Sequence, residues 1–222
     1  MPDLSQFQNP RFARMYERVS VESDRFGASE HRRRLLAGLS GRVVEIGAGN
    51  GLNFAHYPPA VREVVAIEPE DRLRALAERE AGRVAGRVAG RAALPVRVLA
   101  GHGEELPVED DGFDAAVVSL VLCSVPHQAV ALAEVRRVLR AGGELRFFEH
   151  VRSAHRGVAL VQHVVTPLWR RFGGGCRLNR DTGRAIAASG LVVEEMERFS
   201  FKALPSSPAL PHILGRARNP AA

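Results

Sequence analysis

The sequence predicts an α/β protein built on a doubly wound sheet of seven strands, mostly parallel, with an antiparallel last strand. Two patterns support this fold class. From Arg42 onward, apolar runs of strand length alternate with segments whose apolar residues recur at helical spacing, which is typical of repeated βαβ units. Near the carboxyl end, two more strand-like runs are joined through Pro205, Pro208 and Pro211. This proline-marked return indicates that the last pair of strands is antiparallel.

Each element can be assigned in chain order. Strands are expected at 42–46, 63–67, 96–100, 114–119, 144–149, 191–201 and 212–217. Helices are expected at 52–57, 70–88 and 128–139. Ala141, Gly142 and Gly143 should end the last of these helices and turn the chain into the fifth strand. A four-residue repeat over 81–92 offers no group that binds or reacts, so we expect a surface helix or loop there.

Length and composition favour one domain. A chain of 222 residues with 45% hydrophobic and 25% charged residues can bury one substantial core, so we expect a single domain over 1–222. Within it, 1–40 is expected to form a helical lid, and 151–185 an inserted cap where the βαβ pattern ends. We interpret Cys123 and Cys176 as free thiols, because a chain of this size needs no disulfide framework.

Charge and hydropathy exclude two classes of partner. No apolar run reaches the roughly 18 to 20 residues of a membrane span, and the polar start lacks a signal-peptide pattern. We therefore expect a cytoplasmic protein without a stable membrane anchor. The net charge of +6 comes almost entirely from scattered arginines, and aromatic residues make up only 6% of the chain. Because nucleic-acid-binding surfaces cluster basic and aromatic residues, we expect a small-molecule partner and no nucleic acid; the oligomeric state stays open.

The main functional signal is a turn rich in glycine. A buried strand runs directly into Gly47, Gly49 and Gly51, and the turn then opens a short helix. Glycines are needed where a ligand approaches the backbone so closely that a side chain would block it. A dinucleotide fingerprint would place its third glycine at position 52, which is Leu52. The turn therefore departs from the pattern of an NAD-binding site.

Two carboxylates flank this turn. Glu45, two residues before the first glycine, would repel a pyrophosphate but favour the ammonium group of an amino-acid ligand. Glu68 ends the second strand, where it can accept hydrogen bonds from both ribose hydroxyls of a nucleoside. Glu45 could instead be a solvated strand-end residue beside a plain turn. The three features together favour a nucleoside that carries a cation.

Further motifs reveal a family resemblance. The segment 101–107 follows the third strand, 111–118 contains Phe113-Asp114 before an apolar run, and 134–143 closes the last expected helix. With the glycine turn, these motifs resemble in order those of the class I S-adenosylmethionine-dependent methyltransferases, over about 42–150. The resemblance implies a Rossmann-like sheet and S-adenosylmethionine as the methyl donor.

The resemblance also implies which residues hold the donor. The glycine turn would cradle it, Glu68 would hold its ribose and 102–104 would meet its adenine. This sequence has His102 where the family usually has an adenine-binding aspartate, but backbone groups of Gly103 and Glu104 could still recognise the base. The expected donor-binding residues are Glu45, Gly47, Ala48, Gly49, Gly51, Asn53, Glu68, Pro69, His102, Gly103, Glu104 and Leu120.

A closer resemblance involves the segments 120–125, 147–151, 174–176 and 211–215. Together they look like the branch that includes the mammalian alkyl-thiol methyltransferases and many bacterial relatives. This sequence lacks the hydrophobic amino-terminal anchor of those mammalian proteins. The resemblance therefore implies a thiol acceptor and does not imply membrane attachment.

The acceptor side is less marked. Methyl transfer from a sulfonium needs positioning in a dry pocket, and an acceptor of high pKa would also need a base. His150, at the end of the fifth strand, is the candidate catalytic residue, although it could instead bond locally and organise the cap. His163 and His212 are weaker candidates. No Cys/His ligand spacing is present, so no metal site is expected.

Several alternatives stay open. The segments 12–16 and 166–169 could fold over the pocket or only cover the edge of the sheet. The acceptor could be a thiol, a phospholipid amine or a quinone-like ring, in falling order of preference. An NAD-dependent oxidoreductase is opposed by Leu52 and Glu45, and a non-catalytic protein that senses the donor would carry the same donor motifs.

Overall fold

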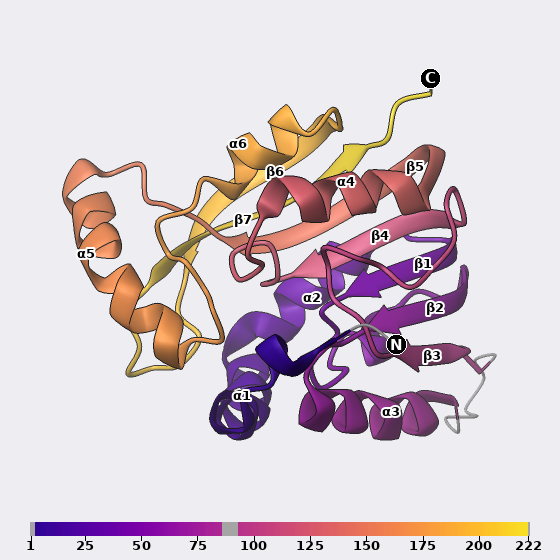
Figure 1. Cartoon of the computed structure of the whole chain (residues 1–222), viewed down its shortest axis with the longest axis horizontal. Helices are drawn as coiled ribbons and strands as arrows, with labels where there is room; N and C mark the ends of the chain where they lie inside the picture. The colour runs from indigo at the N-terminus through magenta and orange to yellow at the C-terminus, as the bar shows by residue number, and fades with distance from the viewer. Residues whose placement is uncertain (1–2, 86–92, 222) are drawn as a thin grey trace.

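A computed structural model describes residues 3–85 and 93–221. Within these residues, seven strands form one sheet in the order β3-β2-β1-β4-β5-β7-β6 (Figure 1). The strands are β1 (Gly41–Ile46), β2 (Val61–Ile67), β3 (Val96–Leu99), β4 (Phe113–Ser119), β5 (Leu139–His150), β6 (Val192–Phe201) and β7 (Leu210–Arg218). The α-helices are α1 (Pro10–Ser23), α2 (Ser29–Leu36), α3 (Asp71–Ala85), α4 (Gln128–Val138), α5 (Arg156–Phe172) and α6 (Thr182–Ala188). Short helical turns are η1 (Ser5–Phe7), η2 (Asp24–Ala28) and η3 (Phe54–His56).

The pairing of the strands confirms the predicted fold class. β1 pairs in parallel with β2 and β4, β2 with β3, and β4 with β5. β7 is antiparallel to both of its neighbours, β5 and β6. Among the described strands, β7 therefore runs against all the others. Because β1 has β2 on one side and β4 on the other, the carboxyl ends of β1, β2 and β4 meet at the point where the strand order reverses.

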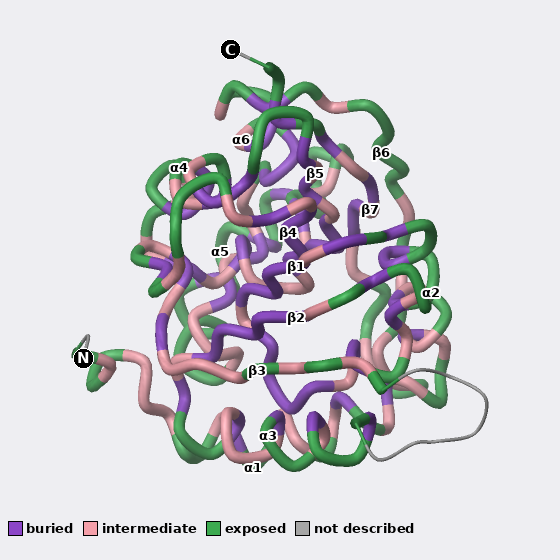
Figure 2. The backbone as a smooth tube through the Cα atoms, turned by 90° about the vertical axis from the view of Figure 1, so that its right-hand side faces the viewer, coloured by how far each residue is buried: buried purple, intermediate pink, exposed green. Residues whose placement is uncertain are grey.

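A helix layer covers each face of the sheet. Successive strand residues point to opposite faces, so neighbours in β1 belong to different cores. Val44 belongs to the buried cluster that includes Leu132 of α4, whereas Val43 belongs to the cluster that includes Leu35 of α2. Figure 2 shows the buried backbone concentrated along the central strands. The site at the strand ends thus rests on a sheet packed from both sides.

The structure differs from the predicted elements at two places, and a third prediction extends into residues that it does not describe. β5 begins at Leu139, so Gly142 and Gly143 lie inside the strand and do not precede it. Hydrogen bonds to Asn219 continue the backbone pairing there: Gly142 N–H donates to its carbonyl at 2.8 Å, and its own N–H donates to Gly143 O at 2.7 Å. The helix expected at 52–57 is only the short turn η3. The helix expected at 70–88 is α3, and residues 86–92, with most of the repeat, lie outside the described residues.

The segment expected to form a cap contains α5. Figure 1 shows this helix beyond the ends of the strands, apart from both helix layers. Several of its apolar side chains are exposed, including Leu160, Val164 and Leu168. No helix in the described part of the chain combines the length and the apolar character that a membrane crossing requires.

Candidate active site

The glycine turn that follows β1 is a backbone cradle. Gly47 and Gly49 have φ angles of 68° and 58°, in the left-handed region that side chains disfavour. A Cβ on Gly47 would lie 2.5 Å from Val121 Cγ2, and one on Gly49 would lie 3.0 Å from the Tyr16 ring. Gly47 N–H donates to Ile67 O at 2.8 Å, which ties the turn to the end of β2. Both conformation and space therefore require glycine here.

The turn opens onto a cavity of about 430 Å³ at the carboxyl ends of β1, β2 and β4, a volume in the range of small-molecule sites. The predicted donor-binding residues that line the cavity are Gly47, Gly49, Glu68, Pro69, His102, Gly103 and Leu120. The other predicted site residues are not part of its lining: Glu45, Ala48, Gly51, Asn53, Glu104 and His150. More than half of the expected donor-binding set thus shares one cavity.

Glu68 supplies a buried carboxylate to the cavity wall. Its oxygens accept hydrogen bonds from the backbone N–H groups of Gly49, at 2.7 Å, and Glu70, at 3.0 Å. Burial raises the pKa of Glu68 to about 7, although both N–H groups favour its ionised form. Glu68 therefore bridges the end of β2 and the glycine turn, where it can also accept hydrogen bonds from a ligand.

Glu45 lies under the turn in a buried polar network. It accepts hydrogen bonds from Asn53 Nδ2 at 2.8 Å and from the Tyr57 hydroxyl at 2.7 Å. Arg32 donates to Asn53 Oδ1 at 2.9 Å, so a buried guanidinium joins the network through Asn53. Burial raises the pKa of Glu45 to about 7. Arg32 was not predicted, although it lies one helical turn before Leu35 on the buried face of α2.

The amino-terminal segment forms another part of the wall. Phe7 stacks on His102, with ring centroids 4.7 Å apart. Gln8 Nε2 donates to Pro69 O at 2.9 Å, which ties this segment to the end of β2. Its cavity-lining residues are Gln6, Phe7, Asn9, Phe12 and Tyr16. From the second expected covering segment, 166–169, no residue lines the cavity, but Arg170 at its end does.

The end of β4 and the segment after α5 each contribute a polar residue to the cavity lining. Ser119 Oγ and Arg177 Nε both belong to cavity-lining residues, and both are buried without a hydrogen-bond partner among residues 3–85 and 93–221. Leu120 has a φ of 61°, a strained conformation for a branched side chain. Its N–H donates to Phe148 O at 2.7 Å, which holds the strained residue in place. The strained turn at Leu120 therefore holds the end of β4 against the cavity.

Glu149 holds the loop that follows β4 through hydrogen bonds to its backbone. Its carboxylate accepts hydrogen bonds from the three consecutive N–H groups of 121–123, at 2.8 to 3.1 Å. The side chain is fully buried, and burial raises its pKa to about 7. Glu149 lies in the segment 147–151 of the family resemblance, but its role was not predicted, because the contact joins the ends of two strands.

His150 lies behind the cavity wall. Its Nδ1 is 3.4 Å from Cys176 Sγ, and its ring packs on that of His212 with centroids 4.4 Å apart. Burial lowers the pKa of His212 to about 3. His163 is exposed, and its Nδ1 is 3.2 Å from Asn179 Nδ2. Of the three candidate histidines, His150 and His212 are brought together, and His163 stands apart.

Comparisons with known proteins identify the family. Residues 44–147 match the family model described as a methyltransferase domain. The chain is 36% identical to human "Thiol S-methyltransferase TMT1B" over 82% of this chain and 73% of that protein. It is 30% identical to the "Phosphatidylethanolamine N-methyltransferase" of Cereibacter sphaeroides, over 69% and 74%.

A solved structure shares the fold. A SAM-dependent methyltransferase of Thermotoga maritima superposes with a TM-score of 0.65 at 22% identity, covering 94% of this chain and 96% of that chain. The sequence relatives decide against an NAD-dependent oxidoreductase and against a non-catalytic sensor. The chain belongs to the class I S-adenosylmethionine-dependent methyltransferases and is an enzyme of that family.

Proposed function

We propose that the enzyme transfers a methyl group from S-adenosylmethionine to the sulfur of a small thiol. The observation that carries this proposal is the cavity at the reversal point of the strand order, with the glycine turn and Glu68 on one wall. The name of the human relative, a thiol S-methyltransferase, supports the choice of acceptor. The donor would supply a methyl group on a positively charged sulfur.

The wall residues suit each part of that donor. The turn at Gly47 and Gly49 lets a ligand approach the backbone closely. We propose that Glu68 accepts hydrogen bonds from the ribose hydroxyls and that Phe7 and His102 contact the adenine. The charge of Glu45, which lies beneath the turn, would favour the ammonium group of the donor's amino-acid part. We assign the other predicted residues near the turn, Ala48, Gly51 and Asn53, to shaping it, and Pro69, Gly103 and Leu120 to the neighbouring wall. Glu104, outside the lining, would hold the segment 102–104 through its contact with His127.

Two further roles follow as proposals. The amino-terminal segment 1–40 would act as a lid, since Phe7, Phe12 and Tyr16 place aromatic rings on the cavity wall. The acceptor would enter beside 170–177, because Arg170, Gly174 and Gly175 also line the cavity. The two cysteines are free, as in a reducing compartment, so we propose a cytoplasmic location.

We propose His150 as the group that receives the acceptor proton. The ordinary pKa of a thiol is about 8.5, so a neutral imidazole is a sufficient base. His150 contacts Cys176, and the chain neighbours of Cys176, which are Gly175 and Arg177, both line the cavity. We therefore propose that the acceptor proton reaches His150 through Cys176, whose chain neighbours line the cavity.

A labelled-methyl assay tests the proposal with three acceptors: an alkyl thiol, a phospholipid amine and a quinol-like phenol. We expect label in the thiol. Glu45→Ala should weaken donor binding measured by calorimetry, and His150→Ala should lower turnover with little change in donor affinity. His163→Ala is the matched control, because His163 is exposed and does not line the cavity. Label only in the amine or the phenol would refute the thiol assignment, and unchanged donor affinity in Glu45→Ala would refute the role of Glu45.

A further inference from the structure

Two thiols and an imidazole from distant parts of the chain meet behind the cavity wall. Cys123 follows β4, His150 ends β5 and Cys176 follows α5. Their sulfur and ring-nitrogen atoms all lie within 4.8 Å of one another, and Cys176 Sγ is 3.4 Å from His150 Nδ1. Both cysteines are buried, and both are free. From this convergence we propose that the three side chains form a zinc site whose fourth position binds the acceptor thiol.

The donor set and its spacing fit zinc. Zinc binds cysteine sulfur at about 2.3 Å and histidine nitrogen at about 2.0 Å, so ligand atoms around a tetrahedral ion lie roughly 3.5 to 3.8 Å apart. The 3.4 Å between Cys176 and His150 is already close to that spacing. Thiolate and imidazole are soft ligands that favour zinc over magnesium or calcium. Three protein ligands and one open position are the pattern of zinc sites that bind a substrate.

The two loops that carry the cysteines are locked to each other. Arg177 N–H donates to Cys123 O at 2.9 Å. The Arg180 guanidinium donates to three carbonyls of the Cys123 loop, those of Leu122, Val125 and Pro126, at 2.6 to 2.9 Å. Glu149 accepts the N–H of Cys123 at 3.1 Å, which fixes the loop from the other side. Ligands held by such outer contacts keep their geometry before the ion arrives.

The two cysteines belong to segments that border the cavity. Ser124, Gly175 and Arg177 line the cavity, and each is next in sequence to one of the two cysteines. A thiol at the fourth position would lose its proton to solvent as the S–H bond breaks, and its sulfur would bind the ion through the freed electron pair. The thiol would then be held as a thiolate at neutral pH. This step rests on the proposed thiol acceptor, whereas the metal site itself does not, and it makes His150 a ligand where the simpler proposal makes it a base.

Cobalt substitution in the untagged full-length protein tests the metal site. The protein is reduced with a phosphine, treated with a chelator and titrated with Co²⁺. We expect one equivalent to give a thiolate-to-cobalt charge-transfer band and the intense visible bands of a tetrahedral site. Cys123→Ser and Cys176→Ser should each weaken cobalt binding by about tenfold or more and remove part of the charge-transfer band. His127→Ala is the control for surface binding, because its side chain is 73% exposed.

The outcomes separate this inference from the proposed function. An alkyl thiol should add a second charge-transfer contribution, and the matching alcohol should add none. Absence of thiolate bands in the folded parent protein, or full bands in Cys176→Ser, would overturn the metal site. Equal rates of thiol methylation in chelator-treated and zinc-loaded protein would overturn the role of the metal while leaving the proposed function intact. Thiolate bands without any thiol methylation would support the site and refute the proposed acceptor.

Discussion

Glu68 illustrates how burial prepares a side chain for a ligand. The residue is 5% exposed, and burial raises the pKa of its carboxyl group to about 7, while two backbone N–H groups hold that group against the glycine turn. Ribose hydroxyls donate hydrogen bonds, so they bind the ionised carboxylate better than the protonated acid. Below pH 7 the carboxyl group must first lose a proton before it accepts both hydroxyls.

We therefore predict that donor affinity increases with pH between 5.5 and 7.5. The dissociation constant should fall by up to about tenfold per pH unit below the pKa, as measured by calorimetry with S-adenosylmethionine. Glu68→Gln should bind weakly and with a much flatter pH profile, because the amide does not titrate. A pH profile in Glu68→Gln as steep as in the parent would assign the titration to another group.

Residues with local signals were predictable, and residues with long-range roles were not. Gly47 and Gly49 were predicted because a turn that admits a ligand needs glycine, and the structure shows both lining the cavity. Phe7 and Glu149 were assigned no role because their partners lie far along the chain. The cluster of Cys123, His150 and Cys176 was not predicted for the same reason. Its three residues lie far apart in the sequence, so they show no short metal-ligand spacing.

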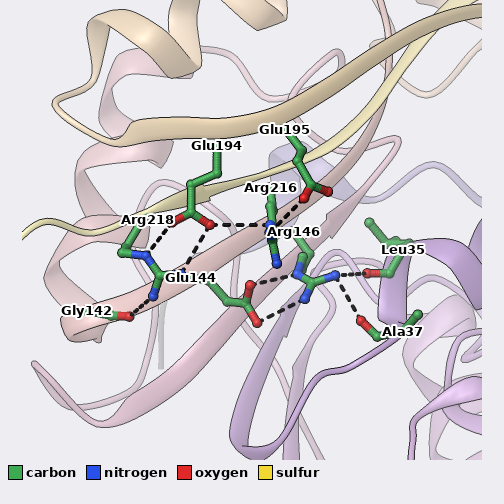
Figure 3. A network of polar contacts seen from close by, with 9 residues as sticks. All are labelled: Leu35, Ala37, Gly142, Glu144, Arg146, Glu194, Glu195, Arg216 and Arg218. Carbon is green, nitrogen blue, oxygen red and sulfur yellow. Dashed lines mark hydrogen bonds and ion pairs between the residues drawn. The ribbon is translucent and has the colours of Figure 1, made fainter.

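At the scale of elements, arginines link β5, β6 and β7 to one another, and one of them, Arg146, also links β5 to α2 (Figure 3). Arg146 of β5 donates to the carbonyls of Leu35, at 3.4 Å, and Ala37, at 3.0 Å, which end α2 without internal partners. It also pairs with Glu144 at 2.9 and 3.2 Å. Arg218 of β7 pairs with Glu194 at 2.5 Å and donates to Gly142 O, but its side chain is 46% exposed against 11% for Arg146.

Because burial decides what such contacts contribute, the two arginines should differ. We predict that Arg146→Met lowers the free energy of unfolding by about 2 kcal/mol, since it leaves two helix-end carbonyls and a half-buried carboxylate without their donor. Arg218→Met should cost less than about 1 kcal/mol. Urea denaturation of both variants measures the difference. Equal losses would show that the Arg146 contacts do not anchor α2.

Element boundaries were predicted best where periodicity was the only signal. The strands expected at 42–46 and 191–201 match β1 and β6 to within one residue at each end. β5 was misjudged because Gly142 and Gly143 are turn signals in sequence, while Asn219 supplies the hydrogen bonds that keep them in the strand. A pairing partner some 76 residues away overrides a local preference.

At the scale of the whole molecule, buried ionisable groups make stability depend on pH. Glu45, Glu68 and Glu149 each have a pKa raised from 4.5 to about 7 by burial. A raised carboxyl pKa contributes stability that is complete below about 4.5 and is lost as the pH rises through 7. His212 acts in the opposite direction: its pKa is lowered from 6.5 to about 3, so its contribution is lost as the pH falls below 6.5.

Groups whose pKa is lowered in the folded state act against the three carboxyl groups, and besides His212 they include His31, His56 and Cys176. The effect of one carboxyl group is therefore isolated by comparing a variant with the parent. We predict that Glu45→Gln gains stability relative to the parent between pH 5.5 and 8, by roughly 1 to 2 kcal/mol, because only the parent loses the contribution of a protonated Glu45 as the pH rises through 7. Thermal unfolding of both proteins at constant moderate salt measures this difference. A difference that stays the same from pH 5.5 to 8 would mean that Glu45 is ionised throughout and that its hydrogen-bond donors outweigh its burial.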